Sequence, residues 1–164
     1  MGDISASDNL TTNTLSAGDI RVGKITGGYS NVASGVNSAV VGGSTNQAIA
    51  QKTFIGGGKS NTASGNYATV GGGKSTIAAG TYSFIGGGCA NQAAADNSSV
   101  IGGASNIIGV DHCHSVIAGS NITSVSANLL HANGLFLKAS TLPTSDPAVA
   151  GVVWNDSGTL KISV

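Results

Sequence analysis

Glutamate is absent from this 164-residue chain, and charged residues of every kind make up only 9% of it. Seven basic residues balance seven acidic ones, so the chain lacks the excess positive charge with which proteins bind nucleic acid or anionic membranes. We therefore expect no nucleic-acid partner. The aspartates are single and scattered, which leaves no paired carboxylates for a glycan-cleaving enzyme. The chain is predicted not to be an enzyme.

Long apolar runs are also missing, because no stretch approaches the roughly 20 apolar residues that span a bilayer. We expect no membrane insertion. The first residues, MGDISASDNL, have neither the basic segment nor the apolar core of a signal peptide, so assembly in a cytoplasm is expected. Two cysteines occur, Cys89 and Cys113, at different phases of the repeat described below. We expect them to be free thiols that act as small buried apolar residues.

What the chain does contain is a repeat of fifteen residues, with glycine pairs or triplets before a recurring asparagine. The asparagines are Asn31, Asn46, Asn61, Asn91, Asn106 and Asn121. Thr76 fills the missed position, and the last copy decays to Ala118-Gly119. A strict period of this kind is typical of one small unit stacked on copies of itself.

Each copy predicts two very short strands joined by two tight turns. Glycine and asparagine tolerate the positive φ that turns require, and each copy closes on a β-favouring pair such as Phe84-Ile85. Alanine or glycine occupies the alternate positions between them, as at Ala63 and Gly65. The fold class predicted is an all-β parallel β-roll, or solenoid, with in-register strands ~4.8 Å apart. Small inward residues make the coil thin, so the remaining apolar side chains need another surface, and we expect a homotrimer.

The copies FIGGGKSNTASGNYAT and FIGGGCANQAAADNSS resemble the head repeats of trimeric autotransporter adhesins. The resemblance covers about residues 27–123 and implies a left-handed β-roll in which three chains form a prism. The period of fifteen is slightly longer than is usual in that family. No export signal, heptad stalk or membrane anchor accompanies the repeats here.

The C-terminal run LFLKASTLPTSDPAVAGVVWNDSGTLKISV, residues 135–164, resembles a segment found in many phage structural proteins. It predicts a β-hairpin in which residues 152–154 and 160–162 flank the turn Asn155-Asp156-Ser157-Gly158. We expect residues 128–164 to cap or trimerise one end of the roll, which occupies residues 27–127. Residues 1–26 lack the repeat and are interpreted as an N-terminal segment that anchors the protein to a larger particle.

One segment, Asp111-His112-Cys113-His114, suggests chemistry. On a strand, His112 and His114 would point to the same face, and three such pairs on a trimer axis would offer six imidazoles to a transition metal. The alternative, which we favour, is that both histidines face solvent in an irregular coil. The spacing from Asn106 to Val116-Ile117 is one residue longer than in the preceding copy, which indicates a local bulge. No other cofactor is expected.

Two further motifs have simpler explanations. The tripeptide Gly73-Lys74-Ser75 is similar to the end of a phosphate-binding loop, but Ala68 stands where that motif needs a glycine. We interpret it as a turn with a solvated lysine. Exposed turn residues form a candidate contact with a host glycan or protein: Lys59, Lys74, Tyr29, Tyr67 and Tyr82. Tyr67 and Tyr82 share a phase, however, so they are favoured to cover the coil instead.

From the repeat and the two resemblances, the function expected is that of a structural virion protein of a tailed phage. It would be a trimeric spike, fibre or capsid-decoration protein, assembled in the host cytoplasm and bound to other capsid or tail proteins. The second hypothesis is the head domain of a bacterial trimeric surface adhesin, which an export signal or an anchor would favour.

Overall fold

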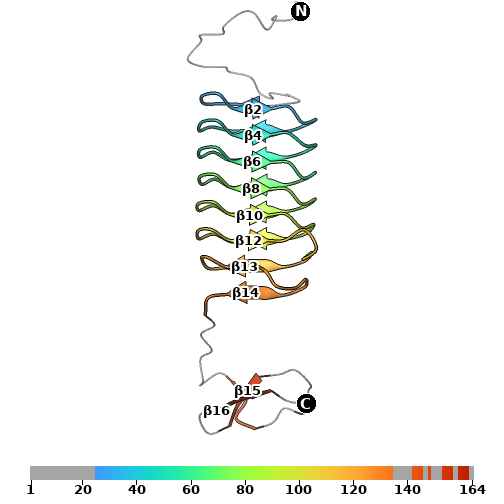
Figure 1. Cartoon of the computed structure of the whole chain (residues 1–164), viewed down its shortest axis with the longest axis vertical. Helices are drawn as coiled ribbons and strands as arrows, with labels where there is room; N and C mark the ends of the chain where they lie inside the picture. The colour runs from blue at the N-terminus through green and yellow to red at the C-terminus, as the bar shows by residue number, and fades with distance from the viewer. Residues whose placement is uncertain (1–24, 135–141, 146–147, 149–152, 157–158, 163–164) are drawn as a thin grey trace, which may run out of the picture.

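The chain forms a parallel β-solenoid of about seven turns, as seen in a computed structural model (Figure 1). The structure describes residues 25–134, 142–145, 148, 153–156 and 159–162. All regular elements within these ranges are strands. No helix in this part of the chain is long and apolar enough to cross a lipid bilayer. The predicted all-β solenoid with a repeat of about fifteen residues is therefore confirmed.

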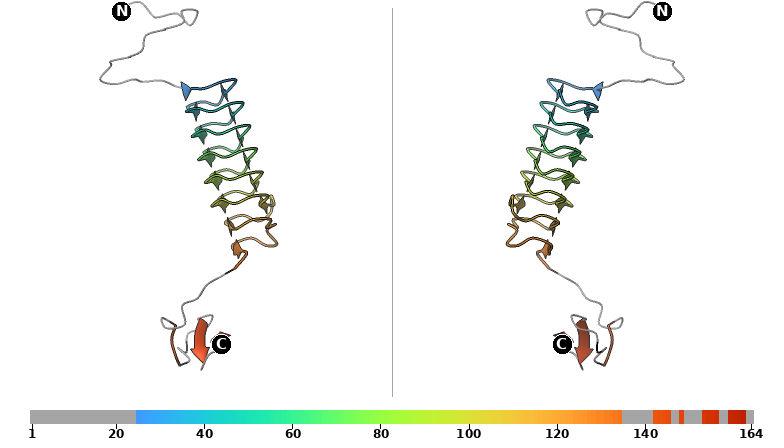
Figure 2. Two further views of the ribbon diagram at one scale, coloured as in Figure 1. Left: turned by 90° about the vertical axis from the view of Figure 1, so that its left-hand side faces the viewer. Right: turned by 90° about the vertical axis from the view of Figure 1, so that its right-hand side faces the viewer.

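Two parallel sheets form the walls of the solenoid. Sheet I contains β1 (Ile25–Thr26), β3 (Ala39–Val40), β5 (Phe54–Ile55), β7 (Thr69–Val70), β9 (Phe84–Ile85), β11 (Ser99–Val100), β13 (Val116–Ala118) and β14 (Leu130–Ala132). Sheet II contains β2 (Val32–Ala33), β4 (Gln47–Ala48), β6 (Thr62–Ala63), β8 (Ile77–Ala78), β10 (Gln92–Ala93) and β12 (Ile107–Ile108). From β1 to β13 the chain alternates between the sheets, so each of these coils contributes one strand to each wall, and β14 then follows β13 within sheet I (Figure 2).

The register follows the repeat of fifteen residues, as predicted. Phe54 pairs with Thr69 in sheet I, and Thr62 pairs with Ile77 in sheet II. Each strand is only two residues long in most coils, yet the ladder continues through the turns. The amide of Lys59 donates to the carbonyl of Gly73 at 2.9 Å, for example. Every coil is thus bonded to the next through both its strands and its turns.

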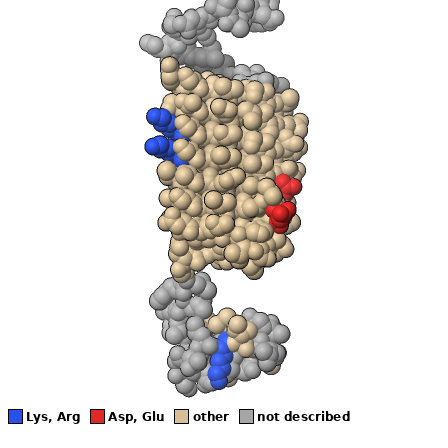
Figure 3. Space-filling view, in the orientation of Figure 1, with Lys and Arg blue, Asp and Glu red and all other residues tan. Residues whose placement is uncertain are grey.

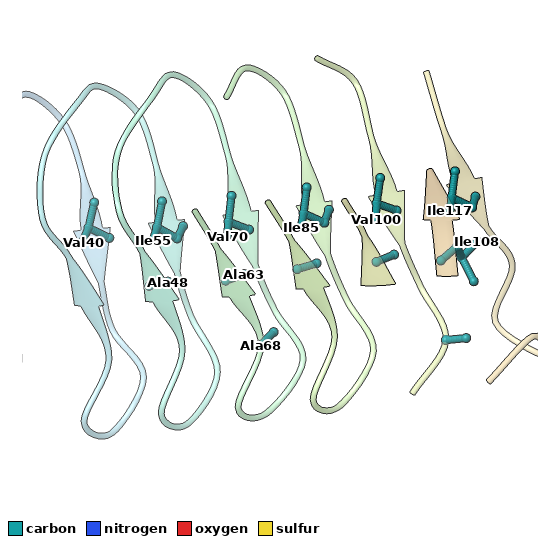
Figure 4. Close-up of a cluster of buried hydrophobic side chains, with 13 residues drawn as sticks. Val40, Ala48, Ile55, Ala63, Ala68, Val70, Ile85, Val100, Ile108 and Ile117 are labelled. Atoms are coloured by element: carbon teal, nitrogen blue, oxygen red, sulfur yellow. The ribbon is translucent and has the colours of Figure 1, made fainter. Parts of the chain in front are cut away.

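The core is a single file of large side chains facing a single file of small ones. Valine and isoleucine from sheet I are fully buried at Val40, Ile55, Val70, Ile85, Val100 and Ile117. Opposite them, sheet II contributes the fully buried alanines Ala48, Ala63, Ala78 and Ala93, followed in its last strand by the fully buried Ile108 (Figure 4). Burying a valine or isoleucine side chain stabilises the fold by roughly 1.5–3 kcal/mol. The alanine file lets the two sheets lie close together, so the thin coil predicted from the small residues is confirmed.

A ladder of buried asparagines fixes one corner of every coil. The Oδ1 atom of Asn46 accepts the backbone N–H of Asn61 at 3.0 Å, one coil further along. Its Nδ2 atom donates to Gly42 in its own coil at 3.1 Å and to Gly58 in the next at 3.0 Å. Each amide therefore satisfies turn groups that would otherwise be buried without partners. Thr76 continues the ladder in its coil by donating both its amide and its hydroxyl to Asn61 Oδ1.

Glycine is required at the turn position that precedes this corner by three residues. Gly58 has φ +91°, and a Cβ there would lie 2.1 Å from the carbonyl oxygen of Gly73. Neither the left-handed backbone nor the close approach of the next coil allows a side chain.

The bulge predicted near Asn106 is present, but it is longer than the sequence suggested. Ile117 pairs with Val100, seventeen residues earlier, rather than with Ile101. The strand of the preceding coil is therefore Ser99–Val100, and Ile101 lies outside it. The next turn is one residue shorter, which reduces the offset from seventeen to sixteen: Ile122, not Asn121, donates its amide to Asn106 Oδ1 at 3.1 Å.

The predicted C-terminal hairpin is also present. Strand β15 (Val153–Asp156) pairs antiparallel with β16 (Thr159–Ile162), and Asp156 lies opposite Thr159. Asn155 and Asp156 therefore belong to the strand rather than to the turn. Whether this hairpin caps or trimerises the roll stays a prediction. Of the predicted anchor, residues 1–26, the first 24 lie outside the described residues, and Ile25–Thr26 form β1 of sheet I.

Candidate functional site

The two histidines of the predicted metal site lie in turns and not on a strand. They fall within the insertion between β12 and β13. His112 Nδ1 is 2.5 Å from the Oγ of Ser124, a buried hydroxyl that also accepts the amide of Gly109 at 3.1 Å. His114 is exposed and has a left-handed backbone with φ 58°. The premise that both rings share one strand face is therefore wrong, because the inserted residues form turns.

Metal binding by one copy of the described chain has no geometric support. The described residues include no group of three or more His, Cys, Asp or Glu side chains that could hold a metal ion. A site shared by three chains stays a prediction. The cysteines are free, as expected, but Cys89 is exposed rather than buried, because it lies on an outward turn. Cys113 is half-buried and packs against the core.

One edge of the solenoid carries a stacked pair of tyrosines. The rings of Tyr67 and Tyr82 lie 4.7 Å apart at an interplanar angle of 16°. The ammonium of Lys52 sits 4.9 Å from the Tyr67 ring centroid and donates to its hydroxyl at 3.3 Å. Tyr67 therefore contacts both the Tyr82 ring and the Lys52 ammonium. The stacking of the two rings contributes about 0.5–1.5 kcal/mol. This supports the interpretation that the tyrosines cover the turns.

The opposite turn forms a second column, here called the lysine column. Its members are bridged to one another coil by coil: Tyr29, Ser44, Lys59, Lys74, Cys89 and Ala104. Lys59 and Lys74 are exposed neighbours in adjacent coils. On the face that Figure 3 shows, a pair of basic side chains projects from one side of the solenoid and acidic ones lie on the other. This edge therefore has an exposed pair of positive charges.

The outer faces of both sheets expose apolar side chains. Phe54 and Phe84 are exposed on sheet I, and Val41 and Ile101, which directly follow strands β3 and β11 of that sheet, are 55% and 59% exposed. On sheet II the exposed apolar residues are Val32, Ile49, Ile77 and Ile107. No charged residue belongs to the strands of either sheet in residues 25–134. Uncharged polar side chains such as Thr69 and Ser99 alternate with them along sheet I. Exposed apolar side chains on an uncharged face are typical of surfaces that contact another protein.

Five glycines beside sheet I have no internal reason to be glycine. They are one residue before the left-handed turn glycine in successive coils, and we call them the glycine column: Gly42, Gly57, Gly72, Gly87 and Gly102. None has positive φ. A Cβ on Gly72 or Gly87 would meet no atom within 4 Å, and one on Gly57 would only touch a backbone carbon at 4.0 Å. The fold of one chain would therefore accept larger side chains there.

Sequence reasoning missed this distinction, because every glycine of a Gly-Gly-Gly turn looks alike in one dimension. It also missed the contact between Lys52 and Tyr67, which are fifteen residues apart. The constant phase of those two positions was the signal that could have found it. Sequence reasoning did place Lys59 and Lys74 on an exposed turn.

No pocket is present among the described residues. Comparison with protein-family models finds no match to this chain, and comparison with curated proteins finds no similar sequence. The resemblances noted from the repeats and from the C-terminal run therefore stay resemblances.

Proposed function

We propose that the chain is a structural virion protein of a tailed phage, a homotrimeric β-roll that acts as a spike, fibre or capsid-decoration protein. Its role is mechanical: continuous backbone ladders form a rigid rod, and one end attaches to other virion proteins. The exposed turns contact the host surface. The C-terminal run that resembles phage structural proteins supports the virion assignment.

The homotrimer proposal rests on the glycine column together with the exposed apolar side chains of sheet I and its edge. At these positions neither the backbone φ nor a neighbouring atom of the same chain excludes a side chain. Glycine is then explained if the surface of another molecule packs closely against the backbone there. Val41 and Ile101 flank the column in its first and last coils. A second copy fits this face because the face has no charge to desolvate and repeats at the strand spacing.

The geometry also favours a closed ring over a simple dimer. Seven coils at ~4.8 Å each give a face ~34 Å long, and three or four residues at ~3.3 Å give a width of ~12 Å. One such strip covers ~400 Å², about half of what a stable pairwise interface buries on each partner. In a closed trimer every chain meets two neighbours, so the contact area for each chain doubles.

Light scattering coupled to size exclusion tests the oligomer. The full chain is expected to elute at three times the 15.9 kDa chain mass at micromolar concentration. Gly72→Val with Gly87→Val should give a folded protein of lower oligomeric mass, because both side chains fit the single coil but obstruct the face. Ala79→Val, on the outer side of sheet II, is the control and should stay trimeric.

A wild-type monomer would refute the homotrimer, and a trimeric glycine variant would refute this choice of face. The virion assignment has its own test. Antibody labelling of purified phage particles should mark a regular position on the head or tail in micrographs. Absence of the protein from particles that are otherwise complete would overturn the assignment.

A further inference from the structure

The lysine column places two ammonium groups side by side without a structural requirement for either. Lys59 and Lys74 bridge as direct neighbours in adjacent coils, and both are exposed. The same column position holds Ser44 before them and Cys89 and Ala104 after them. Neutral side chains of different sizes are therefore compatible with this position, and like charges directly opposite each other oppose folding slightly.

Within the solenoid, no acidic residue shares this edge. The aspartates of residues 25–134 are Asp96 and Asp111. Asp96 lies on the opposite turn, where its carboxylate accepts the amide of Thr81 at 2.7 Å. Asp111 lies in the insertion after β12. The third lysine of the solenoid, Lys52, is also on the opposite turn, against Tyr67. Figure 3 shows a pair of basic groups on one side of the solenoid and the acidic groups on the other.

We propose that the lysine column binds an acidic polysaccharide, with one carboxylate or sulfate group held between Lys59 and Lys74. The two backbones are one strand spacing apart, ~4.8 Å, so both flexible side chains can reach a single anionic group. Ser44 adds a hydroxyl in the preceding coil. Tyr29, which is 77% exposed, begins the column and offers an apolar ring ~10 Å from Lys59.

This combination is suited to a polymer of sugar acids lying along the solenoid. Cations hold the acidic groups, and the aromatic ring covers an apolar sugar face. A nucleic acid is disfavoured because the column offers only two cations and one ring, too few for the backbone tracking that single-stranded binding needs. The proposal rests on the host-contact part of the proposed function for the source of the polymer. Three copies in a trimer would strengthen binding through multivalency.

Binding of the full chain to immobilised polygalacturonate, a carboxylated polysaccharide, tests the site, with dextran sulfate and neutral dextran as parallel surfaces. We expect binding to one or both acidic polymers, none to neutral dextran, and a decrease as salt is raised. Lys59→Gln with Lys74→Gln should weaken binding at least about tenfold. Lys52→Gln, which removes one positive charge from the opposite edge, should change binding less than about twofold, and either single variant, Lys59→Gln or Lys74→Gln, should weaken it more than Lys52→Gln does.

Three outcomes would refute the proposed glycan site. Absence of binding to both acidic polymers would do so, and equal losses from Lys52→Gln and from the double variant would indicate diffuse charge only. Equal or tighter binding to single-stranded DNA would assign the column to nucleic acid instead. Light scattering of the same samples separates these failures from failure of the proposed function, because neither lysine belongs to the glycine column. A trimer present in particles that binds no acidic polymer would refute the glycan site alone.

Discussion

Replacing the buried Asn61 of the asparagine ladder should destabilise the solenoid far more than replacing Asn66, an exposed asparagine five residues away. Asn61 is fully buried. Its Nδ2 atom donates to the carbonyls of Gly57 at 3.0 Å and Gly73 at 2.9 Å. Its Oδ1 atom accepts the amide of Thr76 at 3.1 Å. Asn61→Ala removes all of these bonds and adds no atom that could replace them.

The cost follows from which partners remain unsatisfied. Gly73 keeps a second donor, because its carbonyl also accepts the amide of Lys59 at 2.9 Å. The buried amide and hydroxyl of Thr76 lose the acceptor that they share, which costs about 1–3 kcal/mol. The carbonyl of Gly57 loses its side-chain donor but is only partly buried, so the low end of that range, about 1 kcal/mol, applies to it. Asn61→Ala should therefore lower the free energy of unfolding by about 2–4 kcal/mol.

Urea unfolding followed by far-ultraviolet circular dichroism measures this difference, at one fixed protein concentration because an oligomer's stability depends on it. The matched control is Asn66→Ala. Asn66 also accepts a backbone amide of a neighbouring coil, that of Gln51 at 3.2 Å, but it does so in solvent. Water can replace that bond, so we expect a change within about 0.5 kcal/mol. Equal losses of stability in the two variants would refute the view that buried amides hold the corner together.

Three further predictions concern the core and the insertion. Ser83 Oγ is the buried polar side-chain atom left without a partner in the described part of the chain, so Ser83→Ala should be neutral or stabilise by up to about 1 kcal/mol. Ser98→Ala removes the hydrogen bond from the Ser98 hydroxyl to the Ala95 carbonyl at 2.6 Å and should cost about 1 kcal/mol in the same urea assay. A greater loss of stability from Ser83→Ala than from Ser98→Ala would contradict this account. Ala63→Leu should destabilise by about 3 kcal/mol or prevent folding, visible as lost circular dichroism, because the inward file has no room. If the metal prediction holds, elemental analysis should find iron, nickel, zinc or copper in the wild type and less after replacement of His112 and His114 by alanine; a metal-free wild type would end it.

The repeat was readable because the solenoid is built from local rules applied many times. Each coil needs a small inward residue, a buried amide at the corner and a left-handed glycine, and each requirement leaves one mark every fifteen residues. The insertion was harder to place. The pair Val116-Ile117 looked equivalent to Val100-Ile101, whereas the structure aligns Ile117 with Val100. Two adjacent β-branched residues fit a strand in either phase, and only burial decides which of them faces inward.

For the candidate surfaces too, the sequence predicted some features and the structure supplied the others. Exposure of Lys59 and Lys74 followed from their place in a turn, and the structure adds that they are neighbours on an edge without acidic residues. The same-face geometry of the metal hypothesis holds only on a strand, and the insertion puts His112 and His114 outside the strands. The irregular coil that we favoured fits this backbone, although His112 is half-buried and only His114 is exposed.

The sequence alone determined the period, the two-walled coil and the thin core, since each depends on residues within one or two copies, whereas the buried corner that the asparagines form came from the structure. The tertiary structure decided at which glycines a side chain would clash with the next coil and at which glycines a side chain would meet no atom of the same chain. That difference depends on the atoms of the next coil: a Cβ on Gly73 would meet the Gly88 carbonyl at 2.4 Å, and one on Gly72 would meet nothing. Two adjacent glycines are indistinguishable until the coils are stacked, because the reason for each lies in a neighbour fifteen residues away or outside the chain.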